Sequence, residues 1–493
     1  MSPFSSFAGD AQRGKEVYER YCWWCHGEKG EGDGPASAFL NPPPRDFTYG
    51  LYKWKSTPFE EFTPAKRDFY SMVSGSFPHG DSGRDSMGAS AMPAWKDVLK
   101  EREITNVIEY IKAFAEIKEP EKGPIDLSKK VKASEKSIER GAKLFKKNCS
   151  ECHGKAGRGD GEKRLKDDFG FRTWPRNLTK PWTFRAGSTP EAIYTRITVG
   201  IAGTQMPSLA DPESKRRLSA EQRWDIANYV QTLAEPYKKP GPGAVINALR
   251  VEGALPETPE DPLWDKAPYK SFYTAPQVLV PEKEYTPTID SISVKALYNG
   301  VEAALLIAWD DPTESVPGDR VSMKIAGGEV FRDAVAVQFP LKRGRGAQRP
   351  YFGMGGPGEP VNIWHWQGRA LTSPERVSFI NSRGYKKMEK SEPRGLFARG
   401  FYDSGRWRVI MKRRLKTMTP AKEAQFQEGV FMPVAFAAWD GSNNEKGSRH
   451  VMTSWYWLYL EPKRGFNIFL WSAFVFLAVC TGEFFIVRNF KKG

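Results

Sequence analysis

The chain has little cysteine and little histidine, with five of each among 493 residues. So few thiols exclude the general disulfide framework that stabilises many small secreted domains. Four of the five cysteines form two pairs of identical spacing, Cys22 with Cys25 and Cys149 with Cys152, while Cys480 stands alone in an apolar run. The paired thiols therefore indicate a dedicated chemical use.

Two further features are missing. The first ten residues contain no basic stretch followed by an apolar run, so no cleavable secretory signal is recognised and the export route stays open. The formal net charge is +15, but the basic residues are scattered and no nucleic-acid-binding motif accompanies them. The charge therefore favours an acidic protein partner, an anionic lipid surface or a solvated lysine surface over nucleic acid.

The composition is that of a folded protein with several domains. Hydrophobic residues make up 40% of the chain and aromatic residues 13%, which argues against extensive disorder. A chain of 493 residues exceeds the usual size of one hydrophobic core.

The first half of the chain contains one pattern twice. Each copy has an Arg-Gly pair, then Cys-x-x-Cys-His-Gly and Gly-Asp-Gly, and closes with a Met-Pro pair before an amphipathic helical stripe. This order predicts two tandem copies of one small helical domain, at residues 1–118 and 119–239. The matching residues are Arg13, Cys22, Cys25, His26, Gly32 and Met92, and then Arg140, Cys149, Cys152, His153, Gly159 and Met206.

The two Cys-x-x-Cys-His strings point to covalent haem. Thiols three residues apart lie on one face of a helical turn, where both can form thioethers with the vinyl groups of a haem. The histidine that follows lies under the iron as its proximal ligand, so we predict one haem c at His26 and one at His153. A four-cysteine zinc site would leave both histidines without a role. A thioredoxin-like motif would need a βαβ pattern that is not seen here.

Each copy also offers a sixth iron ligand. Met92 and Met206 lie in Met-Pro loops after their histidines, and a thioether there would hold a low-spin haem of relatively high potential. Met87 is the alternative in the first copy, and methionines that only fill a core are common. With these residues both copies resemble class I cytochrome c over residues 10–235. The resemblance implies a small helical domain around a haem whose propionate edge is partly exposed for electron transfer.

The sequence changes character after residue 240. Short alternating or apolar runs of β-type residues, such as 291–297 and 303–309, replace the helical stripes and predict a mainly-β sandwich over residues 240–462. From Phe466 to Val487 the chain is almost wholly apolar and long enough as a helix to span a bilayer. The predicted fold class is thus two all-α cytochrome c domains, one mainly-β sandwich and one C-terminal transmembrane helix at residues 463–493.

The β-rich half contains candidate ligands for another haem. Met354 lies in a glycine-rich loop, as a packing residue or as a soft metal ligand, and His450 precedes an aromatic run. The strings at 332–340, 353–355 and 439–442 resemble the haem b domain of ethylbenzene dehydrogenase and related gamma subunits of molybdenum oxidoreductases, over residues 245–460. The resemblance implies a β-sandwich that holds a non-covalent haem b between a methionine and a lysine.

This chain departs from that family pattern at one position. Met354 matches the methionine, but the lysine position falls on His450. Because histidine is an ordinary haem ligand, we predict that Met354 and His450 coordinate one haem b. Lys446 as the ligand and a haem-free domain kept as a scaffold are the alternatives. His365, between two tryptophans, is interpreted as a core imidazole.

Together these features predict a membrane-anchored electron-transfer subunit with two c haems and one b haem. It would relay electrons between another carrier and a molybdenum oxidoreductase or a quinol-oxidising cytochrome b complex, with a soluble redox carrier and membrane lipid as further contacts. A di-haem peroxidase would need an open iron, which the two Met-Pro loops disfavour, and a pure assembly module would leave both haem strings idle. We expect the bulk of the chain on the periplasmic face and its C-terminus in the cytoplasm.

Overall fold

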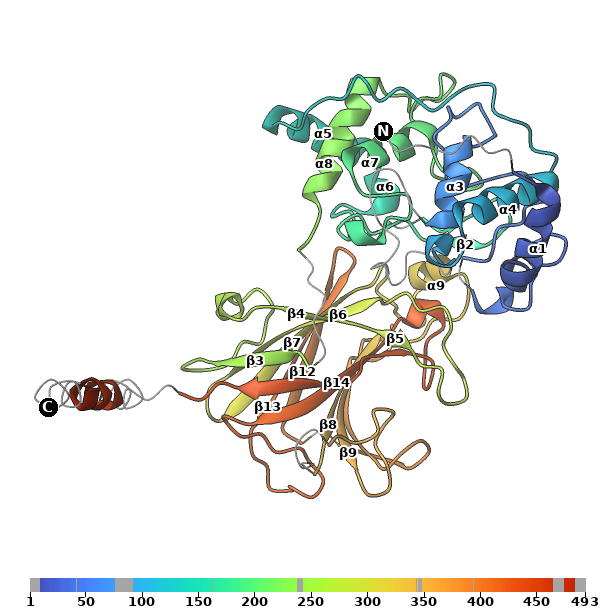
Figure 1. Ribbon diagram of the computed structural model, residues 1–493. Coiled ribbons are helices and arrows are strands. Elements are labelled where there is room, and N and C mark those ends of the chain that lie inside the picture. The colour runs from blue at the N-terminus through green and yellow to red at the C-terminus, as the bar shows by residue number, and fades with distance from the viewer. Residues whose placement is uncertain are drawn as a thin grey trace, which may run out of the picture.

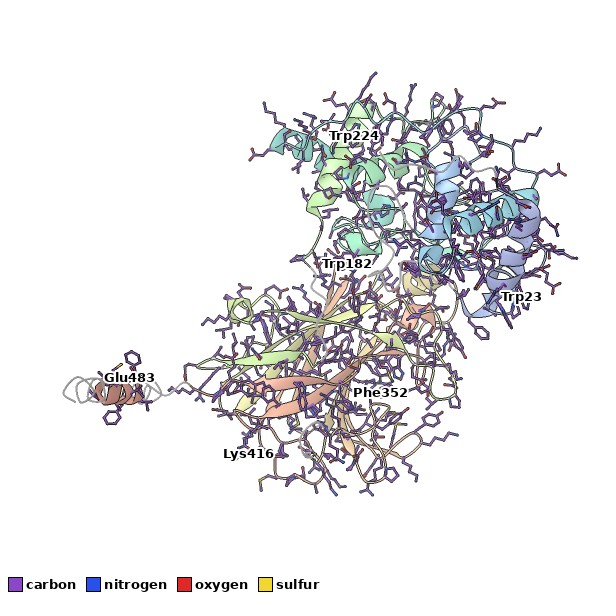
Figure 2. All side chains as sticks on the ribbon, in the orientation of Figure 1. Trp23, Trp182, Trp224, Phe352, Lys416 and Glu483 are labelled. Atoms are coloured by element: carbon purple, nitrogen blue, oxygen red, sulfur yellow. The ribbon has the colours of Figure 1, made fainter. Side chains whose placement is uncertain are left out.

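The computed structural model describes residues 9–40, 42–75, 92–161, 163–236, 243–342, 344, 348–392, 394–463 and 474–483. Two helical domains lie together at one end of a large β-domain (Figure 1). Trp182, in the turn η3 (Pro181–Thr183), lies at the junction between the second helical domain and the β-domain (Figure 2).

The first helical domain is built around the crossing of its first and last helices. Gly14 lies at this crossing, where a Cβ atom would come within 2.1 Å of the carbonyl oxygen of Asn106. The close approach buries Tyr18, Ile104 and Val107 in one core. The elements are α1 (Ala11–Tyr21), α2 (Trp23–His26), η1 (Ser37–Phe39), α3 (Lys66–Ser74), η2 (Trp95–Asp97) and α4 (Glu101–Ala113).

The second helical domain repeats this arrangement. Gly141 lies at the equivalent crossing, where a Cβ atom would come within 2.1 Å of the carbonyl oxygen of Asp225. The repeated Arg-Gly pair therefore marks the helix crossing in both domains. The all-α prediction is wrong in one detail, since this domain also contains a short antiparallel hairpin. The Asp167 carboxylate accepts hydrogen bonds from the backbone N–H groups of Phe169 and Phe171 and so stabilises the turn of this hairpin. The elements besides η3 are α5 (Glu135–Asn148), α6 (Ser150–His153), β1 (Leu165–Lys166), β2 (Arg172–Thr173), α7 (Pro190–Val199) and α8 (Ala220–Thr232).

The β-domain contains one continuous sheet among the described residues. Strand order along it is β11-β10-β9-β8-β14-β16-β3-β6-β7-β13-β12. The strands are β3 (Val245–Arg250), β4 (Lys270–Tyr273), β5 (Ala275–Pro276), β6 (Ser291–Tyr298), β7 (Glu302–Asp310), β8 (Ala334–Pro340), β9 (Val361–Gln367), β10 (Arg376–Ser382), β11 (Met388–Ser391), β12 (Leu396–Asp403), β13 (Arg406–Arg414), β14 (Phe431–Trp439), β15 (Val451–Met452) and β16 (Tyr456–Leu460). The helical turns are η4 (Pro262–Lys266), α9 (Arg320–Ala326) and η5 (Gly441–Asn443).

Strand β14 joins the two halves of this sheet. Residues Phe431 to Val434 pair with β16, and Ala435 to Trp439 pair with β8. Side chains from both halves, among them Ile307 and Trp364, meet in one large core. The predicted mainly-β sandwich is therefore corrected: the sheet is continuous, and it is mixed because β16 with β3 and β3 with β6 are parallel. The alternation of apolar and polar residues along a strand indicates which face of the strand is buried, but it does not indicate which other strand pairs with it.

The predicted C-terminal transmembrane helix is also corrected. Within the described residues no helix is long and apolar enough to cross a membrane. The helical residues described in this segment are 474–483.

Candidate haem sites

The first Cys-x-x-Cys-His string forms one tight helical turn. The backbone N–H groups of Cys25 and His26 both donate to the carbonyl oxygen of Cys22, at 3.2 and 3.0 Å, which places both thiols and the imidazole along one short surface. Nδ1 of His26 lies 2.9 Å from the carbonyl oxygen of Arg45. A carbonyl can only accept, so Nδ1 carries the proton and Nε2 is left to bind iron.

The second string has the same geometry. The N–H groups of Cys152 and His153 donate to the carbonyl oxygen of Cys149, and Nδ1 of His153 lies 3.0 Å from the carbonyl oxygen of Arg176. Burial lowers the pKa of this imidazole, so it is neutral, the form in which histidine binds a metal. Both strings therefore share one geometry, and their role as haem ligands stays a prediction.

The repeated Gly-Asp-Gly string, whose role the sequence left open, folds back onto the Cys-x-x-Cys-His turn. The N–H of Gly32 donates to the carbonyl oxygen of His26 at 2.9 Å, and that of Gly159 to His153 at 2.8 Å. The carbonyl oxygen of Cys25 accepts from Gly34 at 3.2 Å in the same way. The string thus holds the histidine's backbone in place, and Gly32 and Gly159 also pack against the segments that contain Arg45 and Arg176.

A cavity of about 260 Å³ lies against the first string. Met92 lines the same cavity as His26, and its side chain is 39% exposed. The alternative ligand, Met87, lies outside the described residues. In the second domain Met206 packs against the core and is held by a loop in which the N–H of Ile201 donates to its carbonyl oxygen at 3.1 Å.

Basic side chains that the sequence analysis missed line the first cavity. Arg45 and Lys53 come from the first domain and Arg185 from the second. Burial lowers the pKa of Lys53 to about 8 and that of Arg185 to about 9. A buried positive charge is stabilised by an anionic group, so this wall suits a ligand with carboxylates. The repeated Pro-Arg pair that contains Arg45 and Arg176 was the available sequence signal.

In the β-domain, His450 is held in the same way as the other two histidines. Its Nδ1 lies 3.2 Å from the carbonyl oxygen of Gly447, and the indole N–H of Trp439 donates to that same oxygen at 3.0 Å. The two rings pack with centroids 4.6 Å apart. His450 is buried, and its Nε2 is the nitrogen left for a metal.

Met354 lies at the same apolar surface. It packs, as does Trp439, against a cluster formed by Ala336, Val361, Ile363, Ala435 and Trp455 on β8, β9 and β14 and just before β16. Its φ is +72°, a left-handed conformation that is uncommon for a non-glycine residue. The structure therefore brings Met354 and the Trp439–His450 pair to one face of the sheet.

Lys446, the alternative ligand, and His365, the predicted core imidazole, are placed differently. The ammonium group of Lys446 lies 4.0 Å from the ring centroid of Phe331, in a cation–π contact. The ring of His365 packs edge-on against Trp439 at 5.4 Å, and burial lowers its pKa to about 4.

Comparison with known families identifies the domain types. Residues 11–115 and 138–234 match the family described as Cytochrome c, and residues 261–395 match the family described as Ethylbenzene dehydrogenase. The chain thus contains cytochrome c domains followed by an ethylbenzene dehydrogenase-type domain. The second match includes Met354 and ends before His450. The predicted domain boundaries themselves stay predictions.

Individual relatives are haem and redox proteins. A candidate respiratory nitrate reductase heme subunit, ORF7, of Haloferax mediterranei is 29% identical over 43% of this chain and 72% of its own length. The chlorate reductase subunit gamma of Ideonella dechloratans is 26% identical over 43% of this chain and 83% of its own. A chain of the reducing HAO-like protein complex of Kuenenia stuttgartiensis is 36% identical over 47% of this chain and its own full length, with a TM-score of 0.41.

Proposed function

We propose that this chain is the electron-transfer subunit of a molybdenum oxidoreductase complex and binds two haem c groups and one haem b. The observation that carries the proposal is shared by His26, His153 and His450. Each directs Nδ1 at a backbone carbonyl oxygen and leaves Nε2 for iron. Three of the chain's five histidines thus have the orientation that suits a metal ligand bound through Nε2.

The cytochrome c domains supply the covalent sites. The paired thiols would attach each haem, and its iron would be held by His26 and Met92 in the first domain and by His153 and Met206 in the second. When bound, the haem supplies reversible one-electron transfer at the iron. Arg45, Lys53 and Arg185 line the first cavity and would neutralise its propionates.

The ethylbenzene dehydrogenase-type domain supplies the non-covalent site. Ala336 and Ala435, which belong to the apolar cluster against which Met354 packs, are small, and small apolar residues favour a flat ligand such as a porphyrin ring over this face of the sheet. His450 is favoured over Lys446 because its imidazole is already oriented by Gly447, whereas the lysine ammonium lies over Phe331. We therefore propose that Met354 and His450 hold the haem b.

Contacts between the domains support a relay. Phe39 of the first cytochrome c domain packs against Tyr285 of the β-domain, with ring centroids 4.8 Å apart. Close to it, Glu284 pairs with Arg449 at 3.2 Å, and Arg449 precedes His450. The loop that carries the proposed haem b ligand is therefore close to the domain that carries the first haem c.

The named relatives support the choice of partner. They include a nitrate reductase heme subunit and a chlorate reductase gamma subunit. We infer that this chain likewise passes electrons between a separate catalytic subunit and another carrier. We also propose that the haem domains lie on the periplasmic face, and expression with and without a cleavable leader tests this: covalent haem should form only in the exported protein.

Pyridine haemochrome spectra of the purified protein, before and after acid–acetone extraction, test the haem content. Extraction removes haem b and leaves thioether-bound haem c. Two retained haems and one extracted haem per chain support the proposal. His450→Ala should lose only the extracted haem, while Lys446→Ala, the matched control, should keep all three. Two retained and none extracted would reduce the β-domain to a scaffold.

A further inference from the structure

Three aspartates far apart in the sequence meet inside the β-domain. Asp311 follows β7, Asp333 precedes β8 and Asp440 follows β14, and each is fully buried. One carboxylate oxygen from each lies within 4.8 Å of the others. The ends of three strands therefore meet at a cluster of three carboxylates.

Two of the three carboxylates are well supported by hydrogen bonds. Asp333 accepts from the indole N–H of Trp407 at 2.9 Å and from the backbone of Gly441 at 2.8 Å. Asp440 accepts from the Thr288 hydroxyl at 2.6 Å. Asp311 differs, because Oδ1 accepts from the N–H of Thr313 while Oδ2 is buried and has no hydrogen-bond partner. An orphaned buried oxygen in a native fold calls for an unseen ligand or proton.

Counter-charges are missing as well. In the part of the chain that the structure describes, no lysine or arginine forms an ion pair with Asp311, Asp333 or Asp440. The guanidinium group of Arg172, from the second cytochrome c domain, reaches only as far as the carbonyl oxygen of Ser442, at 3.2 Å. Burying several carboxylates without a cation is strongly unfavourable.

We propose that Asp311, Asp333 and Asp440 bind one divalent cation of the calcium class. The three ligands offer oxygen only, which suits a hard cation and not the softer metals that prefer nitrogen or sulfur. The hydroxyl groups of Thr313 and Ser442, which hydrogen-bond to each other at 2.9 Å beside the carboxylates, are further oxygens of the same kind. This site is separate from all three haem sites.

The neighbours of these aspartates give the site its role. Asp310 precedes Asp311 and forms ion pairs with Lys180 of the second cytochrome c domain and with Arg406. Trp439 precedes Asp440 and packs against His450. A cation at this point would fix the strand ends that present both the domain junction and the proposed haem b ligand.

Metal analysis of the full-length holoprotein tests the inference without using haem or activity. After dialysis against metal-free buffer, about one Ca²⁺ or Mg²⁺ per chain should remain, and EDTA should lower the Tm until Ca²⁺ is added back. Asp311→Asn should lose the ion and the Ca²⁺-dependent rise in Tm. Asp403→Asn, an exposed aspartate at the end of β12, is the matched control and should keep both.

The opposite result is equally clear. The cation site is refuted by a wild-type protein with no bound divalent ion and no Tm response to EDTA or Ca²⁺, and by an ion that Asp311→Asn leaves in place. An Asp311→Asn variant as stable as the wild type would then show that the carboxylates share protons instead. If this variant does not fold, the metal content of the wild-type protein and the response of its Tm to EDTA and Ca²⁺ decide between a bound cation and shared protons.

Discussion

Trp439 and His450 share one hydrogen-bond acceptor. The indole N–H and the imidazole Nδ1 both lie within hydrogen-bonding distance of the carbonyl oxygen of Gly447, at 3.0 and 3.2 Å. The two rings pack with their centroids 4.6 Å apart and their planes tilted by 36°. Trp439 thus fixes the plane of the imidazole from the side, and the carbonyl fixes its tautomer.

Trp439→Phe should weaken haem b binding without affecting haem c. The indole N–H and part of the packing surface are lost, and loss of a group that orients a ligand typically costs about 10–100-fold in affinity. Transfer of haem to apomyoglobin measures the change. Trp264→Phe is the control, since that indole also donates to a backbone carbonyl, of Thr258, but in another cluster. Equal transfer rates for all three proteins would contradict the role of Trp439.

Met354→Gly should abolish haem b binding yet leave the domain folded. The residue has a φ of +72°, which glycine adopts at no steric cost, so the change relieves about 1–3 kcal/mol of backbone strain while it removes the thioether. Extractable haem and Tm are the measurements. Met354→Leu, which keeps the apolar bulk and the strain, should also lose haem b. Retention of haem by either variant would exclude Met354 as a ligand.

Met206→Ala should open one haem c iron. The loop is held by its backbone, through the N–H of Ile201, so the substitution removes the thioether with little change in the chain path. We expect one high-spin c haem in the EPR spectrum and binding of one CO per chain after reduction. Met323→Ala, at an exposed methionine, is the control. CO binding to a c haem of the wild type would instead favour the peroxidase reading.

Asp310→Asn should loosen the junction between the second cytochrome c domain and the β-domain. The carboxylate lies 2.9 Å from Lys180 and 2.7 Å from Arg406, with 9% of its side chain exposed. Removing one member of a buried ion-pair network costs about 3–5 kcal/mol. Guanidinium unfolding monitored at the Soret band reports the loss. Asp290→Asn, which pairs with Lys180 from a more exposed position, should cost less.

Lys55 should make stability depend on pH in the alkaline range. Its ammonium group donates to the carbonyl oxygen of Glu61 at 2.6 Å, and burial, with Arg196 nearby, lowers its pKa from 10.5 to about 8. Between these values the unfolded chain binds more protons than the folded one, so stability contributed by this group rises with pH. Denaturant unfolding across this range should show a smaller rise for Lys55→Met than for the wild type or for Lys118→Met, an exposed control.

Local features were predictable from the sequence. The spacing of Cys22, Cys25 and His26 sets a helical turn by itself, so the ligand geometry follows from adjacent residues. The glycine repeats were visible, but their roles were not. Gly14 matters only because another helix crosses there, and a crossing partner is not written in the local sequence.

Long-range features were not predictable. Arg185 belongs to the second domain yet lines the cavity of the first, and its sequence neighbours give no sign of this. Asp311, Asp333 and Asp440 are separated by many residues and converge only because their strands end at one place. Such sites depend on strand order and domain docking, which periodicity does not encode.

The divided pairing of β14 limits how this domain can change over evolution. Because one half of the strand is registered against β16 and the other against β8, a single-residue insertion or deletion inside it would leave one half in register and shift the other by one residue. Every strand residue beyond the change would then point to the opposite face, and Trp439 would lose its position beside His450. Length variation among homologues should therefore accumulate in the loops and spare this strand.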